Sequence, residues 1–221
     1  MCLVLKTFPE QRNGILIVNK ENHEAATAAF ADLDFKVTTG NRYLGGFIGE
    51  KDARDTWIKE KVANWIDAVK ELASAAVKFP QSAYAGLQKS LQQEWQYLQR
   101  VCKDIGDEFS DLWKAISETF LSALYGDELD VDQTLDPRIS LASLSGRFAG
   151  LALPEPTVLA KGNYDSSVLV SSHLIAAMRG RDVFRTADHT ATHRSTTSEV
   201  RTRKRAKNDS DLTLIVSKVN C

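Results

Sequence analysis

Two histidines, His189 and His193, have the spacing of a metal site on a helix. Residues four apart lie on one helical face, where both imidazoles could reach the same ion. Asp188 is the one further ligand type beside them, and the pair lacks the glutamate of the H-E-x-x-H metalloprotease pattern. Because the surrounding segment is rich in serine and threonine, we interpret both as surface histidines and predict no metal site.

Four closely spaced glycines are the next candidates, because glycine-rich loops can bind phosphate. They are Gly40, Gly45, Gly46 and Gly49. Neither the G-x-G-x-x-G order nor a following Gly-Lys-Ser/Thr is present, so we interpret them as turn and bulge glycines. Ser143 and Ser145, just before Gly146, likewise lack the G-x-S-x-G context of a nucleophile elbow.

Acidic residues and a cysteine near the middle of the chain form no complete catalytic set. Cys102 has no base partner in the sequence. The acids lie at the expected start of a helix, where negative charge is stabilised by the helix dipole, so we predict capping rather than acid–base catalysis. They are Asp104, Asp107, Glu108 and Asp111. We predict no catalytic residues in this chain.

Tryptophans and a basic run are possible nucleic-acid contacts. Tryptophan can stack on bases. However, Trp65, Trp95 and Trp113 lie on or beside apolar helical stripes, and only Trp57 does not. We therefore interpret the tryptophans as core residues. The basic run comprises Arg201, Arg203, Lys204, Arg205 and Lys207. Phosphate contact or a nuclear-import signal is one interpretation, and a solvated charged tail is the other.

Composition limits the class of protein. The chain has 221 residues, 43% of them hydrophobic, with 28 basic and 29 acidic side chains and a net charge of −1. These values exclude disorder throughout and a globally basic nucleic-acid binder. No apolar run approaches the roughly 18–20 residues of a bilayer span, so we predict no membrane partner. The three unpaired cysteines favour an intracellular protein, cytoplasmic or nuclear.

The elements expected to position these residues begin with a small sheet. The run at 14–18 predicts a buried strand, and Asn22 is expected to cap a helix that extends to Leu33. Strands are expected at 35–39 and 42–48, joined by a turn at Gly40-Asn41, with a bulge at Gly45-Gly46. The predicted pattern is β-α-β-β over residues 1–49.

Apolar residues then recur at helical spacing. We predict long helices at about 50–79, 81–101 and 106–125, and short connections favour an antiparallel bundle over residues 50–126. Region 127–180 is expected to contain an acidic exposed loop at 127–136, a short helix at 137–144, an irregular Gly/Pro segment and a helix at 157–178. The fold class is therefore α+β and predominantly helical.

Residues 181–221 are predicted to form a polar basic tail. They contain nine basic and five acidic side chains, a net charge of +4 that leaves −5 on residues 1–180. The apolar periodicity fades there, so an extended helix and a poorly ordered tail both remain open.

Several stretches, read together, resemble the part of a retrotransposon reverse transcriptase that follows its catalytic centre. The most specific is VTTGNRYLGGFIG at 37–49. The others are GILIV at 14–18, PQSAY at 80–84, SLQQEW at 90–95 with Tyr97 and Arg100, and LALPEPT at 151–157. They occur in the family's order across roughly residues 8–180.

The resemblance implies a structural role for each half. In these RNA-directed DNA polymerases a β-hairpin with a Tyr-Leu-Gly signature holds the primer end, and the helices after it form a thumb-like region. By resemblance, residues 1–49 are the palm end and residues 50–126 the thumb-like bundle. The implied primer-grip residues are Arg42, Tyr43, Leu44, Gly45 and Gly46.

The chain departs from the family at its start. The polymerase aspartates, which hold two divalent metals, would lie upstream of residue 8, and residues 1–13 contain no aspartate. Arg12-Asn13 also stands where the family tends to have lysine. We expect a truncated element copy or gene-model fragment with no cofactor of its own, since the divalent metal belongs to the intact polymerase.

Two hypotheses follow. The first is a non-catalytic fragment of a retrotransposon-derived reverse transcriptase that keeps at most weak binding to an RNA or DNA duplex. The alternative is a helical protein–protein interaction module with a basic tail, which the apolar helical stripes would equally support.

Overall fold

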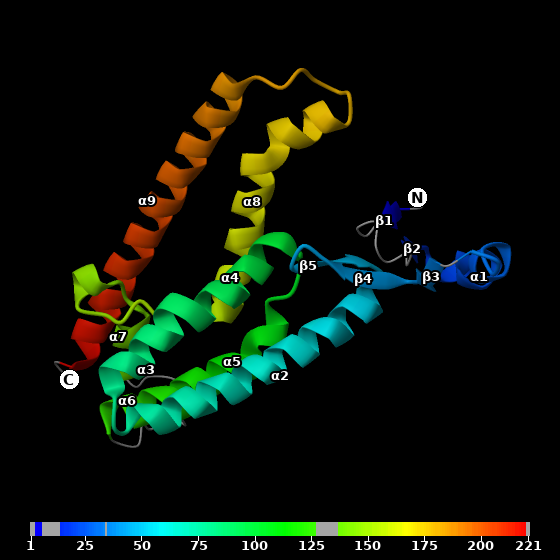
Figure 1. Cartoon of the computed structure of the whole chain (residues 1–221). Helices are drawn as coiled ribbons and strands as arrows, with labels where there is room; N and C mark the ends of the chain where they lie inside the picture. Colours follow the sequence, from blue (N-terminus) through cyan, green and yellow to red (C-terminus); the bar gives the residue numbers. More distant parts are fainter. Residues whose placement is uncertain (1–2, 6–13, 34, 127–136, 220–221) are drawn as a thin grey trace. The chain divides into compact units, whose positions relative to one another are not determined.

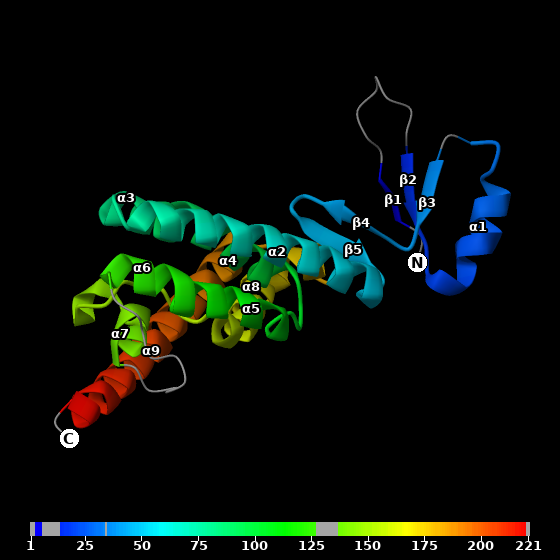
Figure 2. The ribbon, with the colours of Figure 1, turned by 90° about the horizontal axis from the view of Figure 1, so that it is seen from below.

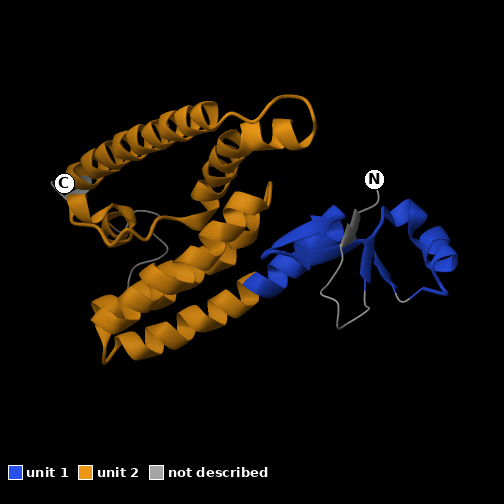
Figure 3. Ribbon diagram, turned by 45° about the horizontal axis from the view of Figure 1, so that its top comes forward, with its two compact units in different colours: residues 1–61 blue, residues 62–221 orange. Residues whose placement is uncertain are grey.

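The computed structural model describes residues 3–5, 14–33, 35–126 and 137–219. The chain divides into two compact units, residues 1–61 and 62–221 (Figure 3). The boundary falls inside one long helix, α2 (Lys51–Ala76). The described part is predominantly helical with small sheets near its start, so the predicted fold class is confirmed.

Unit 1 contains a three-stranded sheet in the order β1 (Leu3–Leu5), β2 (Gly14–Ile17), β3 (Phe35–Thr38). β1 pairs antiparallel with β2, and β2 pairs parallel with β3, so the connection between β2 and β3 crosses over through α1 (Figure 2). Leu16, Ile17 and the following Val18 are buried, which confirms the predicted buried strand.

Helix α1 spans His23–Ala29 and is preceded by a 3₁₀ turn, η1 (Lys20–Asn22). The predicted cap was wrong: Asn22 makes no side-chain capping hydrogen bond, and the helix ends before Leu33. The reason is the conformation of Asn22, φ −101° and ψ 1°, whereas a capping side chain reaches the first turn from extended backbone.

The next two strands, β4 (Gly40–Tyr43) and β5 (Gly46–Gly49), form a separate antiparallel hairpin. The predicted single β-α-β-β sheet and the predicted turn at Gly40-Asn41 were therefore wrong. The turn lies at Leu44-Gly45, where both residues have positive φ, 47° and 79°. This is the conformation of the tight turns that match the strand twist. Gly45 thus belongs to the turn rather than to a bulge.

The three predicted long helices are confirmed, although two contain wider π-helical turns. The first is α2. The second comprises α3 (Pro80–Gly86), the π turn η2 (Leu87–Leu91) and α4 (Gln92–Val101). The third comprises η3 (Asp107–Phe109), α5 (Ser110–Lys114), the π turn η4 (Ala115–Phe120) and α6 (Leu121–Tyr125).

An aromatic cluster occupies the core of unit 2. The ring of Trp65 lies 6.1 Å from that of Trp95 and 6.3 Å from that of Phe109, and all three are buried. The Trp65 Nε1–H donates to Glu94 Oε2 at 2.9 Å, so its polar atom is satisfied. The core interpretation of Trp65 and Trp95 is confirmed.

The remaining elements are α7 (Pro137–Ser143), the 3₁₀ turn η5 (Gly146–Phe148), α8 (Pro156–Met178) and α9 (Thr186–Val219). The predicted acidic loop at 127–136 lies outside the described residues. Of the two forms left open for the C-terminal region, the structure has the extended helix. α9 packs against α8 and α7 (Figure 1), and it buries Thr196 and Ile215.

Candidate functional site

The hairpin of unit 1 carries the residues predicted to grip a primer. Arg42, Tyr43 and Leu44 are exposed, whereas Gly45 is half-buried and Gly46 is buried. The ladder pairs Tyr43 with Gly46 and Arg42 with Phe47. Because Gly46 has no side chain, nothing from the paired position covers the tyrosine ring. Tyr43 and Leu44 therefore form an exposed apolar tip, and Arg42, the preceding residue of β4, is exposed on the opposite face of the hairpin.

Leu44 holds a strained conformation at this tip. Its φ of 47° lies in the left-handed region, which costs a non-glycine residue roughly 1–2 kcal/mol. Asparagine or glycine would form the same turn at lower cost. With 77% of its surface exposed, the leucine side chain gains little from burial in return.

The hairpin is fixed by packing near its tip and by a glycine at its base. The Phe47 and Trp57 rings lie 5.5 Å apart, which attaches the end of β5 next to the turn to α2. Gly49 has a φ of 139°, and a Cβ there would lie 2.2 Å from the Gly40 Cα. The backbone N–H of Glu50 donates to the Thr39 carbonyl oxygen at 2.9 Å and closes this end.

The five residues of the predicted basic tail lie on α9 and separate into two groups. All five are exposed on the helix. Lys204 and Lys207 also line a pocket of about 280 Å³ in unit 2, whereas Arg201, Arg203 and Arg205 are not among its lining residues. Spacing alone did not distinguish the two groups, because the pocket depends on what packs beside α9.

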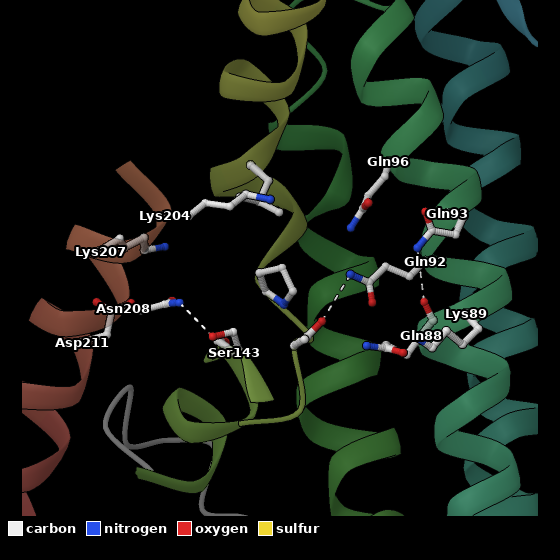
Figure 4. A pocket seen from close by; sticks show the side chains of 14 residues that line it. Gln88, Lys89, Gln92, Gln93, Gln96, Ser143, Lys204, Lys207, Asn208 and Asp211 are labelled. Carbon is white, nitrogen blue, oxygen red and sulfur yellow. Dashed lines mark hydrogen bonds between the residues drawn. The ribbon is translucent and has the colours of Figure 1, made fainter. Parts of the chain in front are cut away.

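This pocket, referred to below as the α4–α9 pocket, has walls from three parts of unit 2 (Figure 4). Glutamines of η2 and α4 line one wall, the segment between α7 and α8 lines the second, and α9 lines the third. The α9 wall consists of Lys204, Lys207, Asn208 and Asp211, which recur at helical spacing on one face. The glutamines were not predicted as site residues, although their recurrence at 88, 92 and 96 was a signal in the sequence.

Three side chains hold the second wall in place through backbone carbonyl oxygens. Tyr84 Oη donates to Leu151 O at 2.7 Å, and Gln92 Nε2 donates to Ala152 O at 3.4 Å. Gln99 Nε2 donates to Pro156 O at 2.8 Å. Three of the stretches that carry the family resemblance, 80–84, 90–95 and 151–157, thus meet at this wall.

The other candidates do not assemble into sites among the described residues. His189 is half-buried and His193 is exposed, and the described ranges contain no group of three or more His, Cys, Asp or Glu side chains that could hold a metal ion. Cys102 is a buried cysteine.

The serine and acidic candidates have structural contacts. Ser143 Oγ donates to Ile139 O at 3.3 Å, and Ser145 Oγ accepts from Asn208 Nδ2 at 3.3 Å. Asp107 and Glu108 lie in the first turn of η3, as the dipole argument predicts, but the residue that caps it, Gly106, offers no side chain. The predicted capping hydrogen bond is therefore absent at this described helix start.

Comparisons with known proteins identify no relative. No protein-family model matches the chain, and neither a curated protein nor a solved structure matches it significantly. The helices in the described ranges also include none with the length and hydropathy needed to cross a membrane.

Proposed function

We propose that this chain is a non-catalytic, reverse-transcriptase-like fragment that binds a nucleic-acid duplex weakly through the β4–β5 hairpin. The observation that carries the proposal is the hairpin tip, where the strand residues Arg42 and Tyr43 and the turn residue Leu44 are all exposed. An exposed aromatic ring offers a stacking surface for a base, and the guanidinium of Arg42, on the opposite face of the strand, offers a separate phosphate contact.

The strain at Leu44 supports the same proposal. Sparsely populated backbone conformations cluster where a surface has a binding role, because stability alone would favour a residue with less backbone strain, such as glycine. The Phe47–Trp57 pair attaches the part of β5 next to the tip to α2, so the tip is presented without the entropy loss of ordering a loop on binding. Such a role places the chain inside the cell, in the cytoplasm or nucleus.

A matched tyrosine pair tests the proposal. Tyr43 and Tyr97 are 43% and 42% exposed, but Tyr97 lies on α4. Binding of a labelled RNA–DNA primer–template is measured by fluorescence anisotropy for Tyr43→Ala and Tyr97→Ala. Loss of one stacked base weakens binding roughly tenfold, and this loss is expected for Tyr43→Ala only. Equal affinity of the two variants would contradict the proposal.

Arg42 provides a second measurement on the same hairpin. A phosphate contact contributes about one unit to the slope of log affinity against log salt concentration. Arg42→Gln is therefore expected to reduce that slope by about one unit, and Arg203→Gln on α9 serves as the exposed control. A slope unchanged by Arg42→Gln would remove the phosphate contact from the proposal.

An interaction module is the second candidate, favoured by apolar side chains exposed along α8. They are Val168, Leu169, Leu174, Ile175 and Met178. Under this alternative the chain does not bind the duplex, and its sedimentation coefficient rises with concentration. Leu169→Glu combined with Leu174→Glu is then expected to abolish that rise, because a charge in an apolar contact is strongly unfavourable.

A further inference from the structure

The α4–α9 pocket contains an unpaired buried acceptor. Gln92 is only 6% exposed and lines the pocket, and its Oε1 has no hydrogen-bond partner. Figure 4 shows the amide pointing from α4 into the pocket. The orientation of the amide is fixed because Nε2 donates to Ala152 O; the reverse orientation would bring two oxygens together. A buried acceptor without a donor costs roughly 1–3 kcal/mol, so a ligand that supplies an N–H or O–H would recover that cost.

Gln99, a second buried glutamine of α4 that does not line the pocket, has both atoms of its amide paired. It lies seven residues further along the same helical face and is fully buried. Its Nε2 donates to Pro156 O, and its Oε1 accepts from Asn163 Nδ2 at 2.8 Å. Both glutamines thus hold the same wall, but only Gln92 keeps an open acceptor.

Cations lie on opposite sides of the same pocket. Lys204 and Lys207 come from α9, and Lys89 comes from η2. Within the described ranges, no carboxylate lies within ion-pair distance of any of these three ammonium groups. One carboxylate, that of Asp211, also lines the pocket. The three lysines give this concave surface a net positive charge that favours an anion.

The remaining lining supplies amide and apolar surface. Figure 4 shows Gln96 directed toward the pocket from α4, and Pro154 and Leu159 contribute apolar surface. Glutamine amides are complementary to the donor and acceptor edge of adenine. The volume of about 280 Å³ lies just below the range of small-ligand pockets, roughly 300–1,000 Å³, and suits one nucleotide unit rather than a polymer.

We infer that the α4–α9 pocket binds a nucleoside phosphate, with the phosphate on Lys204 and Lys207 and a base or sugar donor on Gln92 Oε1. The ligand is either a free nucleotide or the terminal nucleotide of a strand. The inference does not rest on the hairpin, because every residue that carries it belongs to unit 2.

The test uses the full chain and adenosine 5′-monophosphate as the probe, with affinity measured by isothermal titration calorimetry. Lys204→Gln combined with Lys207→Gln is compared with Arg203→Gln combined with Arg205→Gln. Both pairs remove two positive charges from α9, but only the first faces the pocket. The lysine variant is expected to weaken binding roughly tenfold or more, since charge-assisted hydrogen bonds are lost. The arginine variant is expected to retain the affinity of the unaltered chain.

Gln92→Met tests the acceptor separately. It removes the amide at nearly constant side-chain length. The affinity for the nucleotide is expected to fall about fivefold to tenfold. Inorganic phosphate is expected to bind both Gln92→Met and the unaltered chain equally, because it does not require that acceptor. Thermal unfolding followed by circular dichroism verifies that each variant is folded.

Two results would overturn the inference. The first is no binding of the nucleotide at millimolar concentration to the unaltered chain. The second is an equal loss in the lysine and arginine variants, which would indicate nonspecific charge attraction. A 5′-phosphorylated trinucleotide that displaces the bound nucleotide supports the inference with a strand end as the source. If the nucleotide binds and the trinucleotide does not displace it, the inference is supported and the ligand is a free nucleotide.

Discussion

The hairpin of unit 1 and the α4–α9 pocket of unit 2 each contain a non-glycine residue with positive φ, but the two are supported differently. Leu44, with φ 47°, is at the exposed hairpin tip. Ala152, with φ 54°, is in the pocket wall, where its N–H donates to Leu144 O at 2.7 Å and its carbonyl oxygen accepts from Gln92. Tertiary hydrogen bonds therefore fix the conformation of Ala152.

The two positions differ in what accounts for a non-glycine residue with positive φ. A strained backbone persists where its surroundings over-determine it. At Ala152 the hydrogen bonds to the surrounding helices are a sufficient reason. At Leu44 the tight turn of the hairpin sets the backbone conformation, and the residue is 77% exposed.

Removing the core beneath the pocket is expected to have the largest effect. Phe109 is fully buried and stacks with Trp65, which in turn contacts Trp95 on α4. Phe109→Ala leaves a cavity and is expected to lower the free energy of unfolding of unit 2 by about 3–5 kcal/mol. Urea denaturation followed by tryptophan fluorescence measures this loss.

Phe79→Ala is the control for this measurement, because Phe79 is 64% exposed. Its expected change lies within about 0.5 kcal/mol. If both variants lost stability equally, the pocket walls would not depend on the aromatic core, and the comparison with the hairpin would fail.

Gly49→Ala is expected to lower the stability of the hairpin by about 3 kcal/mol. This loss combines backbone strain with overlap between the new Cβ and the Gly40 Cα. Faster hydrogen exchange of the amides at 40–49 measures the effect. Gly146→Ala is the control, since a Cβ there has nothing within 4 Å. Slow exchange retained in Gly49→Ala would show that the hairpin does not depend on this close approach.

The sequence predicts elements that depend on local periodicity. The helices at 51–76, 137–143 and 156–178 lie within a few residues of their predicted ends, because apolar spacing, Pro80 and Pro137 act locally. The π turns at 87–91 and 115–120 had no such signal. They arise from how side chains pack between helices, which a single periodicity does not record.

The hairpin turn and the pocket show where sequence patterns fail. Gly40-Asn41 has better turn chemistry than Leu44-Gly45, so residue preference selected the wrong turn. Gly40 is instead required inside β4, since a Cβ there would lie 2.5 Å from the Phe47 ring. The pocket combines residues from 88–96, 143–159 and 204–211, and only packing brings those segments together.

The two buried glutamines of α4 provide a smaller test within the pocket wall. Gln99→Met leaves Pro156 O and Asn163 Nδ2 without their partner and is expected to cost about 2 kcal/mol. Gln92→Met removes one long hydrogen bond and one unpaired acceptor, so about 1 kcal/mol or less is expected. Thermal denaturation of both variants compares the costs. Equal costs would contradict the difference in hydrogen bonding between the two sites.

The smallest expected effect concerns the two strained residues themselves. Glycine relieves the left-handed strain but loses more backbone entropy on folding, so Leu44→Gly and Ala152→Gly are each expected to gain about 0.5–1 kcal/mol of stability. Leu44→Gly is also expected to weaken binding of the primer–template several-fold, because an exposed apolar contact is lost. Denaturation of both variants and the duplex-binding assay of Leu44→Gly measure these effects. A Leu44→Gly variant that gains stability and keeps full duplex affinity would leave the leucine without a binding role.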